Sequence, residues 1–173
     1  MTPDSIRLLR HFLAAIAYRT QKALAGAPAE FADFRAQPTV RTPHELLWHM
    51  TGLVGYARTF LRGGDYAPPR AASFDAEIAR FHEVLRQLRD DVGDPGLTAT
   101  ISDEQFLQGP FADAMTHAGQ LALLRRLAGS PVPSENFIRA GVSADNVSRA
   151  QPAPAAPDPW WTPDQGPRPP GPT

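Results

Sequence analysis

The stretch Asp113-Ala-Met-Thr-His-Ala-Gly-Gln-Leu-Ala-Leu-Leu-Arg-Arg126 gives the clearest indication of the fold. Its apolar residues recur at helical spacing, and the helix-ending residues Gly129 and Pro131 follow it. We therefore expect a helix from about Phe111 to Ala128. Its inner face is expected to consist of Ala114, His117, Leu121 and Leu124.

Asp113 and His117 lie four residues apart in this expected helix, about 6 Å along its axis. This spacing puts a carboxylate and an imidazole on one helix face, where both can approach a single cation. The same spacing also occurs in solvated pairs and near helix ends, so the pair alone leaves both interpretations open.

A metal site of this kind needs a third ligand from another helix. His49 is the best candidate because it lies in the middle of an expected helix, within the apolar run Leu46-Leu-Trp-His-Met50. Two imidazoles and one carboxylate leave positions open on a divalent metal, which suits a catalytic site where substrate or water completes the coordination.

Three more helices are expected before this one. The first covers residues 4–25 and is capped by Asp4 or Ser5. The second begins at the capping box Thr42-Pro-His-Glu45 and ends at Gly63-Gly64. The third begins at Ser73 or Asp75 and ends at Gly93. Residues 27–41 are expected to form a loop, and residues 95–110 a less regular segment with one helical turn at 103–107. Amphipathic helices with little strand pattern predict an all-α protein, a four-helix bundle.

The sequence from Asp113 to Phe137 resembles the fourth-helix signature of the DinB-like superfamily, His-x-x-x-His-x-Gly-Gln-Leu followed by an arginine pair and a Pro-x-Pro turn. Glu45-Leu-Leu-Trp-His49-Met resembles the family's second-helix motif, in which a histidine binds metal. Helix order and loop lengths agree as well, so the resemblance covers residues 5–140. It implies a DinB-like four-helix bundle over residues 1–140, which in this family is often a homodimer.

The resemblance also implies a metal site with one departure. His49 and His117 match family ligands, whereas Asp113 stands where the family has the first histidine of its pair. A set of two histidines and one aspartate suits zinc, nickel, iron or manganese. The departure leaves a second interpretation open, in which the metal site has been lost.

Characterised members of the family include thiol-dependent S-transferases and a mycothiol-dependent isomerase, and others are assigned as metal-dependent hydrolases. The resemblance thus implies a metal-dependent enzyme for a small-molecule substrate, of the thiol S-transferase or hydrolase type. A thiol would have to come from a low-molecular-weight cofactor, because this chain has no cysteine. No nucleophile or general base stands out. The alternative is a non-catalytic dimeric bundle that binds a small ligand or acts as a scaffold.

Composition bounds these functions. The chain has 173 residues, enough for one domain, with 42% hydrophobic and 20% charged residues. Its net charge of -1 argues against binding to nucleic acid or to an anionic membrane surface. No apolar run is long enough to span a bilayer, and no signal peptide is visible, so we expect a cytoplasmic protein.

Many of the 19 prolines lie near the C-terminus, and we assign residues 141–173 to a proline-rich extension. This extension contains Trp160 and Trp161. Two adjacent exposed tryptophans would favour aggregation, so we expect the extension to dock on its own bundle or on a dimer mate.

Several residues near the candidate site invite individual interpretations. Gln120 is placed to orient His117 or a water, or else to bond to a neighbouring helix. Gly119 is expected to permit close helix packing, and Trp48 to lie in the core with a possible place in a pocket wall. Arg125 and Arg126 are expected to complement the helix dipole while remaining solvated.

Overall fold

The computed structural model describes residues 1–157. Its long helices are α1 (Pro3–Leu24), α2 (Pro43–Arg62), α3 (Phe74–Val92) and α5 (Ala112–Leu127). Shorter helical segments are η1 (Ala29–Asp33), α4 (Asp103–Phe106), η2 (Leu107–Phe111) and η3 (Phe137–Arg139). Within residues 1–157 the only β-type pairing is an isolated bridge between Glu135 and Pro157, so the predicted all-α class is confirmed.

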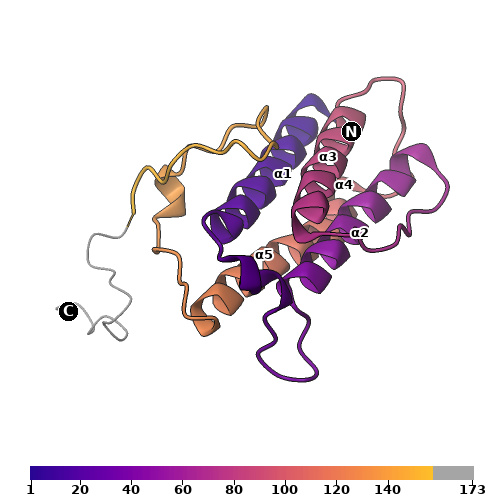
Figure 1. The fold of residues 1–173 in the computed structure, drawn as a ribbon. Coiled ribbons are helices and arrows are strands. Elements are labelled where there is room, and N and C mark those ends of the chain that lie inside the picture. The colour runs from indigo at the N-terminus through magenta and orange to yellow at the C-terminus, as the bar shows by residue number, and fades with distance from the viewer. Residues whose placement is uncertain (158–173) are drawn as a thin grey trace.

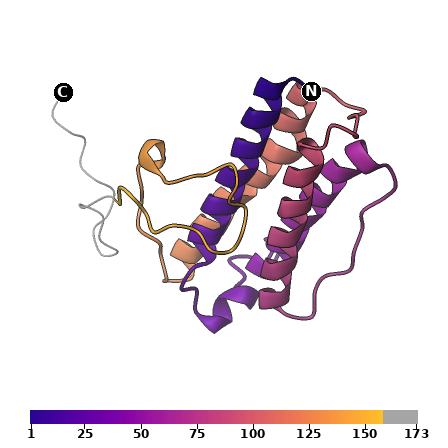
Figure 2. The same cartoon turned by 90° about the horizontal axis from the view of Figure 1, so that it is seen from above.

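The four long helices enclose one core. Helix α2 packs against α3 and α5, and α1 packs against the same two helices, as Figures 1 and 2 show from two directions. The largest fully buried side chains in this core are Tyr18, Phe31, Phe81, Phe106, Phe111, Leu9, Leu13, Ile16, Leu47, Met50, Leu85 and Leu88. In the described part of the chain, no helix combines the length and apolarity that crossing a membrane requires.

Local sequence explains where the helices begin. Thr42 and Glu45 form the expected reciprocal capping box at the start of α2, and Ser73 caps α3. The predicted cap of α1 was wrong by two or three residues, because Thr2 caps this helix. Its side chain accepts from the Ser5 backbone N–H, and Pro3 takes the first helical position, where a missing N–H costs nothing.

The chain breaks just before α5. Gly109 adopts φ -92° and ψ -109°, which is not helical, and Pro110 follows it. The break lets the rings of Phe106 and Phe111 pack 5.8 Å apart with both side chains buried. The predicted helical turn at 103–107 is therefore present as α4, and α5 begins within one residue of its predicted start.

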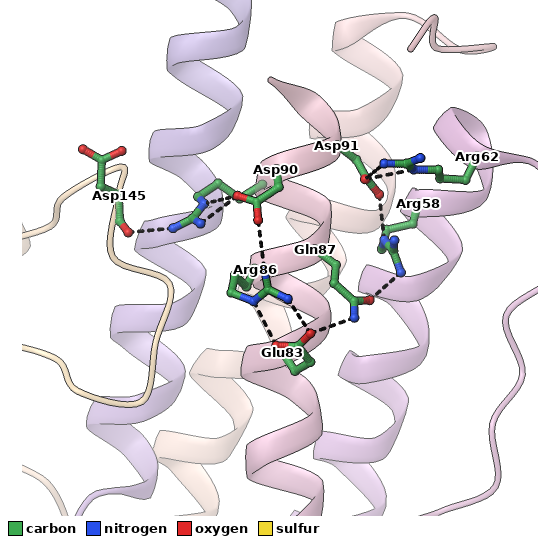
Figure 3. Close-up of polar contacts among 9 residues, drawn as sticks. Arg58, Arg62, Glu83, Arg86, Gln87, Asp90, Asp91 and Asp145 are labelled. Atoms are coloured by element: carbon green, nitrogen blue, oxygen red, sulfur yellow. Dashed lines mark hydrogen bonds and ion pairs between the residues drawn. The ribbon is translucent and has the colours of Figure 1, made fainter. Parts of the chain in front are cut away.

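Helices α2 and α3 are joined by a polar network at one end of the core (Figure 3). The buried Asp91 carboxylate accepts from Arg58 Nε at 2.8 Å through one oxygen and from Arg62 Nη2 at 2.8 Å through the other. Arg58 also donates to the Gln87 side chain. A buried carboxylate needs such partners, since an unpaired buried charge is strongly destabilising.

The predicted solvated position of Arg125 was wrong. Its side chain is buried, and its guanidinium donates to the backbone oxygens of Ala23, Ala25, Gly26 and Ser130 and to the Ser130 hydroxyl. Burial lowers the pKa of Arg125. We expected Arg125 to interact with the C-terminus of its own helix, α5. It also donates hydrogen bonds to the carbonyl groups at the C-terminus of α1.

After α5 the chain returns along α1 as an irregular segment, coloured orange to yellow in Figures 1 and 2. Glu135 accepts from Tyr18 Oη and Lys22 Nζ, each at 2.7 Å, and Val147 is buried against the core. His82 Nδ1 lies 2.8 Å from the Val147 carbonyl oxygen. Residues 135–147 are thus attached to α1 and α3. The predicted docking of Trp160 and Trp161 falls on residues outside those described.

Candidate metal centre

The site begins with two side chains one turn apart on α5. Asp113 Oδ1 lies 3.1 Å from His117 Nε2, and the predicted inner face of α5, including His117, is buried. The Asp113 side chain is 46% exposed, so the pair sits where the core opens to solvent. This is the convergence that the i, i+4 spacing predicts.

His49 reaches the same point from α2. The His49 and His117 rings have centroids 4.9 Å apart and meet edge to face at 75°. One possible ligand atom from each of His49, Asp113 and His117 lies within 4.8 Å of the other two. Two ligands bound at about 2.1 Å can be separated by up to about 4.2 Å across a metal, so only small side-chain movements are needed to close around an ion.

Gln120 determines which ring nitrogen of His117 is free to bind a metal. His117 Nδ1 lies 2.7 Å from Gln120 Oε1, an acceptor, so Nδ1 carries the proton in this contact. Nε2 is then the free nitrogen in the neutral ring, and it faces Asp113. This places Gln120 behind a candidate ligand, in the manner of residues that orient metal-binding histidines.

The donor set fits a cation. With Nδ1 protonated, the Nε2 lone pair of neutral His117 points at a carboxylate oxygen, and two such acceptors repel each other. The contact is favourable only with a proton or a cation between them. His49 is suited to the neutral, metal-binding state, because burial above all, and then the charges of Arg41 and His117, lower its pKa, while Asp113 opposes this.

A cavity of about 400 Å³ opens beside His49. Its walls include Arg41, Trp48, Leu53 and Tyr66. The expected core position of Trp48 was wrong, since this side chain is 39% exposed, but its place in a pocket wall is confirmed. Nothing in the helical periodicity singled out Arg41, which directly precedes the cap of α2.

The remaining histidines lie elsewhere. His11 is exposed on α1. His44 is buried with its ring 5.7 Å from that of Phe74, and His82 is buried beneath Val147. Gly119 does not mediate close packing as expected, because a Cβ there would meet no atom within 4 Å.

Comparisons with known proteins identified no protein similar to this chain. No family model, no curated protein and no solved structure matches the chain, so the likeness to the DinB-like superfamily rests on the sequence motifs quoted above alone.

Proposed function

We propose that the chain is a DinB-like four-helix bundle over residues 1–140, with a proline-rich extension over 141–173, and that it binds a divalent transition metal. His49, Asp113 and His117 would hold the metal, which would be zinc, nickel, iron or manganese. The observation that carries this proposal is the approach of their ligand atoms to within 4.8 Å from two different helices.

The same site is suited to a metal-dependent enzyme of the thiol S-transferase or hydrolase type. A bound divalent cation lowers the pKa of a coordinated thiol or water, which makes a thiolate or hydroxide available at neutral pH. His49 and His117 present nitrogen donors, and Gln120 fixes the His117 ring through its Nδ1 proton. The cavity beside His49 offers room for a small-molecule substrate, and a thiol would come from a low-molecular-weight cofactor.

An activity assay tests the enzymatic part of the proposal. The full chain is reconstituted with each of the four metals and given two assays. In the first, the thiol of free cysteine replaces the chlorine of an aromatic chloride, which forms a C–S bond and releases chloride and a proton. The second is hydrolysis of p-nitrophenyl acetate to p-nitrophenol and acetate. Turnover is expected with at least one metal, to be lost in His49→Ala and retained in His11→Ala, which removes an exposed histidine outside the site. Metal binding without turnover in either assay would count against these enzymatic activities.

A second candidate function is a non-catalytic homodimer used as a scaffold or for ligand binding. It is favoured by Leu123 and Leu127, which lie one turn apart on α5 and are 54% and 56% exposed. Together they present an apolar surface on α5 that a second subunit would cover in a dimer. In this account Asp113 and a protonated His117 are an ordinary ion pair, and the protein binds no metal with stoichiometric occupancy.

A further inference from the structure

One wall of the cavity beside His49 is formed by the segment that follows α2, and several contacts hold this segment in place. The segment after α2 passes over this helix, and the Tyr66 ring occupies the space next to Gly55, where a Cβ would lie 2.0 Å from Tyr66 Cδ1. Trp48 Nε1 donates to the Pro68 carbonyl oxygen at 3.0 Å. The next residues of the segment are held from α3, because Arg80 Nη1 donates to the Pro69 carbonyl oxygen at 2.8 Å.

A buried carboxylate also holds this segment to the helices. Glu77 is fully buried and accepts from the Ala71 backbone N–H at 2.9 Å and from Thr51 Oγ1 at 2.8 Å. These contacts connect the segment to both α2 and α3. The cavity of about 400 Å³ is therefore a formed feature, and it falls in the range of about 300–1,000 Å³ typical of small-molecule sites.

The cavity has aromatic and apolar walls with one permanent charge. Trp48, Leu53, Tyr56 and Tyr66 supply the apolar surface. Arg41 is the only arginine or lysine that lines this cavity among the residues that the structure describes. It lines both this cavity and a second one, which extends to Gln120, so Arg41 is shared by the two cavities.

Arg41 lacks a partner of its own. Among residues 1–157 it makes no ion pair or hydrogen bond, whereas nearby Arg35 pairs with Glu45 at 2.9 Å and Arg70 approaches the same carboxylate at 4.0 Å. An arginine that pairs with no carboxylate of the protein, and that lines an aromatic cavity, is complementary to a ligand that carries an anionic group. A guanidinium binds a carboxylate through two parallel hydrogen bonds.

We propose that this cavity binds a small organic carboxylate with an aromatic or apolar body, whose acid group pairs with Arg41 and whose other end approaches His49. The inference rests on the proposed function in one respect: the end of the ligand near His49 is the end that would react at the metal. Arg41 thereby selects the substrate class, since a neutral ligand of the same shape leaves its guanidinium unpaired. Trp48 and Tyr66 supply the surface for the apolar body.

Phenylacetate and its neutral counterpart phenylacetamide test this proposal. Each is titrated into the full, metal-free chain, and binding is followed by the nuclear magnetic resonance signal of the Trp48 indole N–H, identified by its loss in Trp48→Phe. We expect phenylacetate to shift this signal and to bind about tenfold more tightly than phenylacetamide. Arg41→Gln should abolish the preference, and Arg7→Gln, which changes an exposed arginine on α1, should keep it.

Equal binding of the two probes, no shift with phenylacetate, or an unchanged preference in Arg41→Gln would each overturn the proposal. The metal-free protein separates this result from the metal proposal, because no cation is present to bind the carboxylate. A chain that distinguishes the probes through Arg41 but takes up no metal supports the cavity assignment and contradicts the proposed metal site. A chain that takes up metal but does not distinguish the probes supports the proposed metal site and contradicts the cavity assignment.

Discussion

Asp113 Oδ1 lies 3.1 Å from His117 Nε2, while the other ring nitrogen of His117 is occupied by Gln120. The arrangement directs a free imidazole nitrogen and a carboxylate to one point, which the His49 ring also approaches. If a metal binds there, Asp113 is the one ligand in which this chain departs from the three histidines of the family that it resembles.

Changing that ligand should change metal affinity in a graded way. Asp113→His restores the imidazole of the family pattern and should bind zinc at least as tightly as the parent. Asp113→Ala removes a ligand and should weaken zinc binding by about tenfold or more. Competition with a chromophoric chelator measures both affinities. Equal affinity in the parent and in Asp113→Ala would exclude Asp113 as a ligand.

His82 should make stability depend on pH. Burial lowers its pKa from the ordinary value of 6.5; the Val147 carbonyl opposes this and the Arg149 charge adds to it. The unfolded chain therefore binds more protons than the folded chain once the pH falls below about 6.5, and stability declines with falling pH. Urea unfolding between about pH 7.5 and 5.5 should show a smaller decline in His82→Gln than in the parent.

The exposed His11 provides the control for this experiment, because His11→Gln should retain the full decline. His44 and His49 also have lowered pKa values and contribute in the same direction, so His82→Gln reduces the decline without removing it. An identical decline in His82→Gln and the parent would contradict the assignment of His82 as a buried neutral ring.

Arg125 and Arg126 are adjacent but should respond very differently to substitution. Arg125 is buried and bonds four backbone carbonyls, whereas Arg126 is exposed. Lysine cannot reach the same set of acceptors, so Arg125→Lys should lower the free energy of unfolding by about 2 kcal/mol. Arg126→Lys should change it by less than about 0.5 kcal/mol. Denaturant unfolding measures both, and comparable losses would show that the carbonyl contacts contribute little.

Gly55 and Gly52 form a matched pair on α2. A Cβ at Gly55 would collide with the Tyr66 ring, whereas a Cβ at Gly52 would meet no atom within 4 Å. Gly55→Ala should displace Tyr66 and cost about 1–3 kcal/mol, as overpacking does. Gly52→Ala should be neutral or stabilising by up to about 1 kcal/mol, because alanine favours helix. Thermal unfolding of the two variants tests this, and a stable Gly55→Ala would mean that Tyr66 does not depend on this contact.

The sequence predicts well what depends on neighbouring residues. The capping box of Thr42 and Glu45, the inner face of α5 and the i, i+4 relation of Asp113 and His117 all follow from spacing within one helix. His49 was chosen for its place within an apolar run, and the packing of α2 on α5 brings it to the other two residues.

The errors concern residues whose surroundings come from distant parts of the chain. Arg125 is buried because the carbonyls at the end of α1, about a hundred positions earlier, fold onto it. Gly119 faces open space, although a helical glycine is compatible with close packing. Arg41 belongs to no local sequence pattern, and only the folded structure shows that it lines two cavities.

Metal content of the purified, untagged full chain tests whether His49, Asp113 and His117 form a metal site. Elemental mass spectrometry of the parent, His117→Ala and His11→Ala, each after reconstitution with iron, nickel, manganese or zinc, compares a candidate ligand with an exposed histidine. We expect about one transition metal per chain in the parent and in His11→Ala, and little in His117→Ala. A parent chain without metal after all four reconstitutions would contradict the proposed metal site.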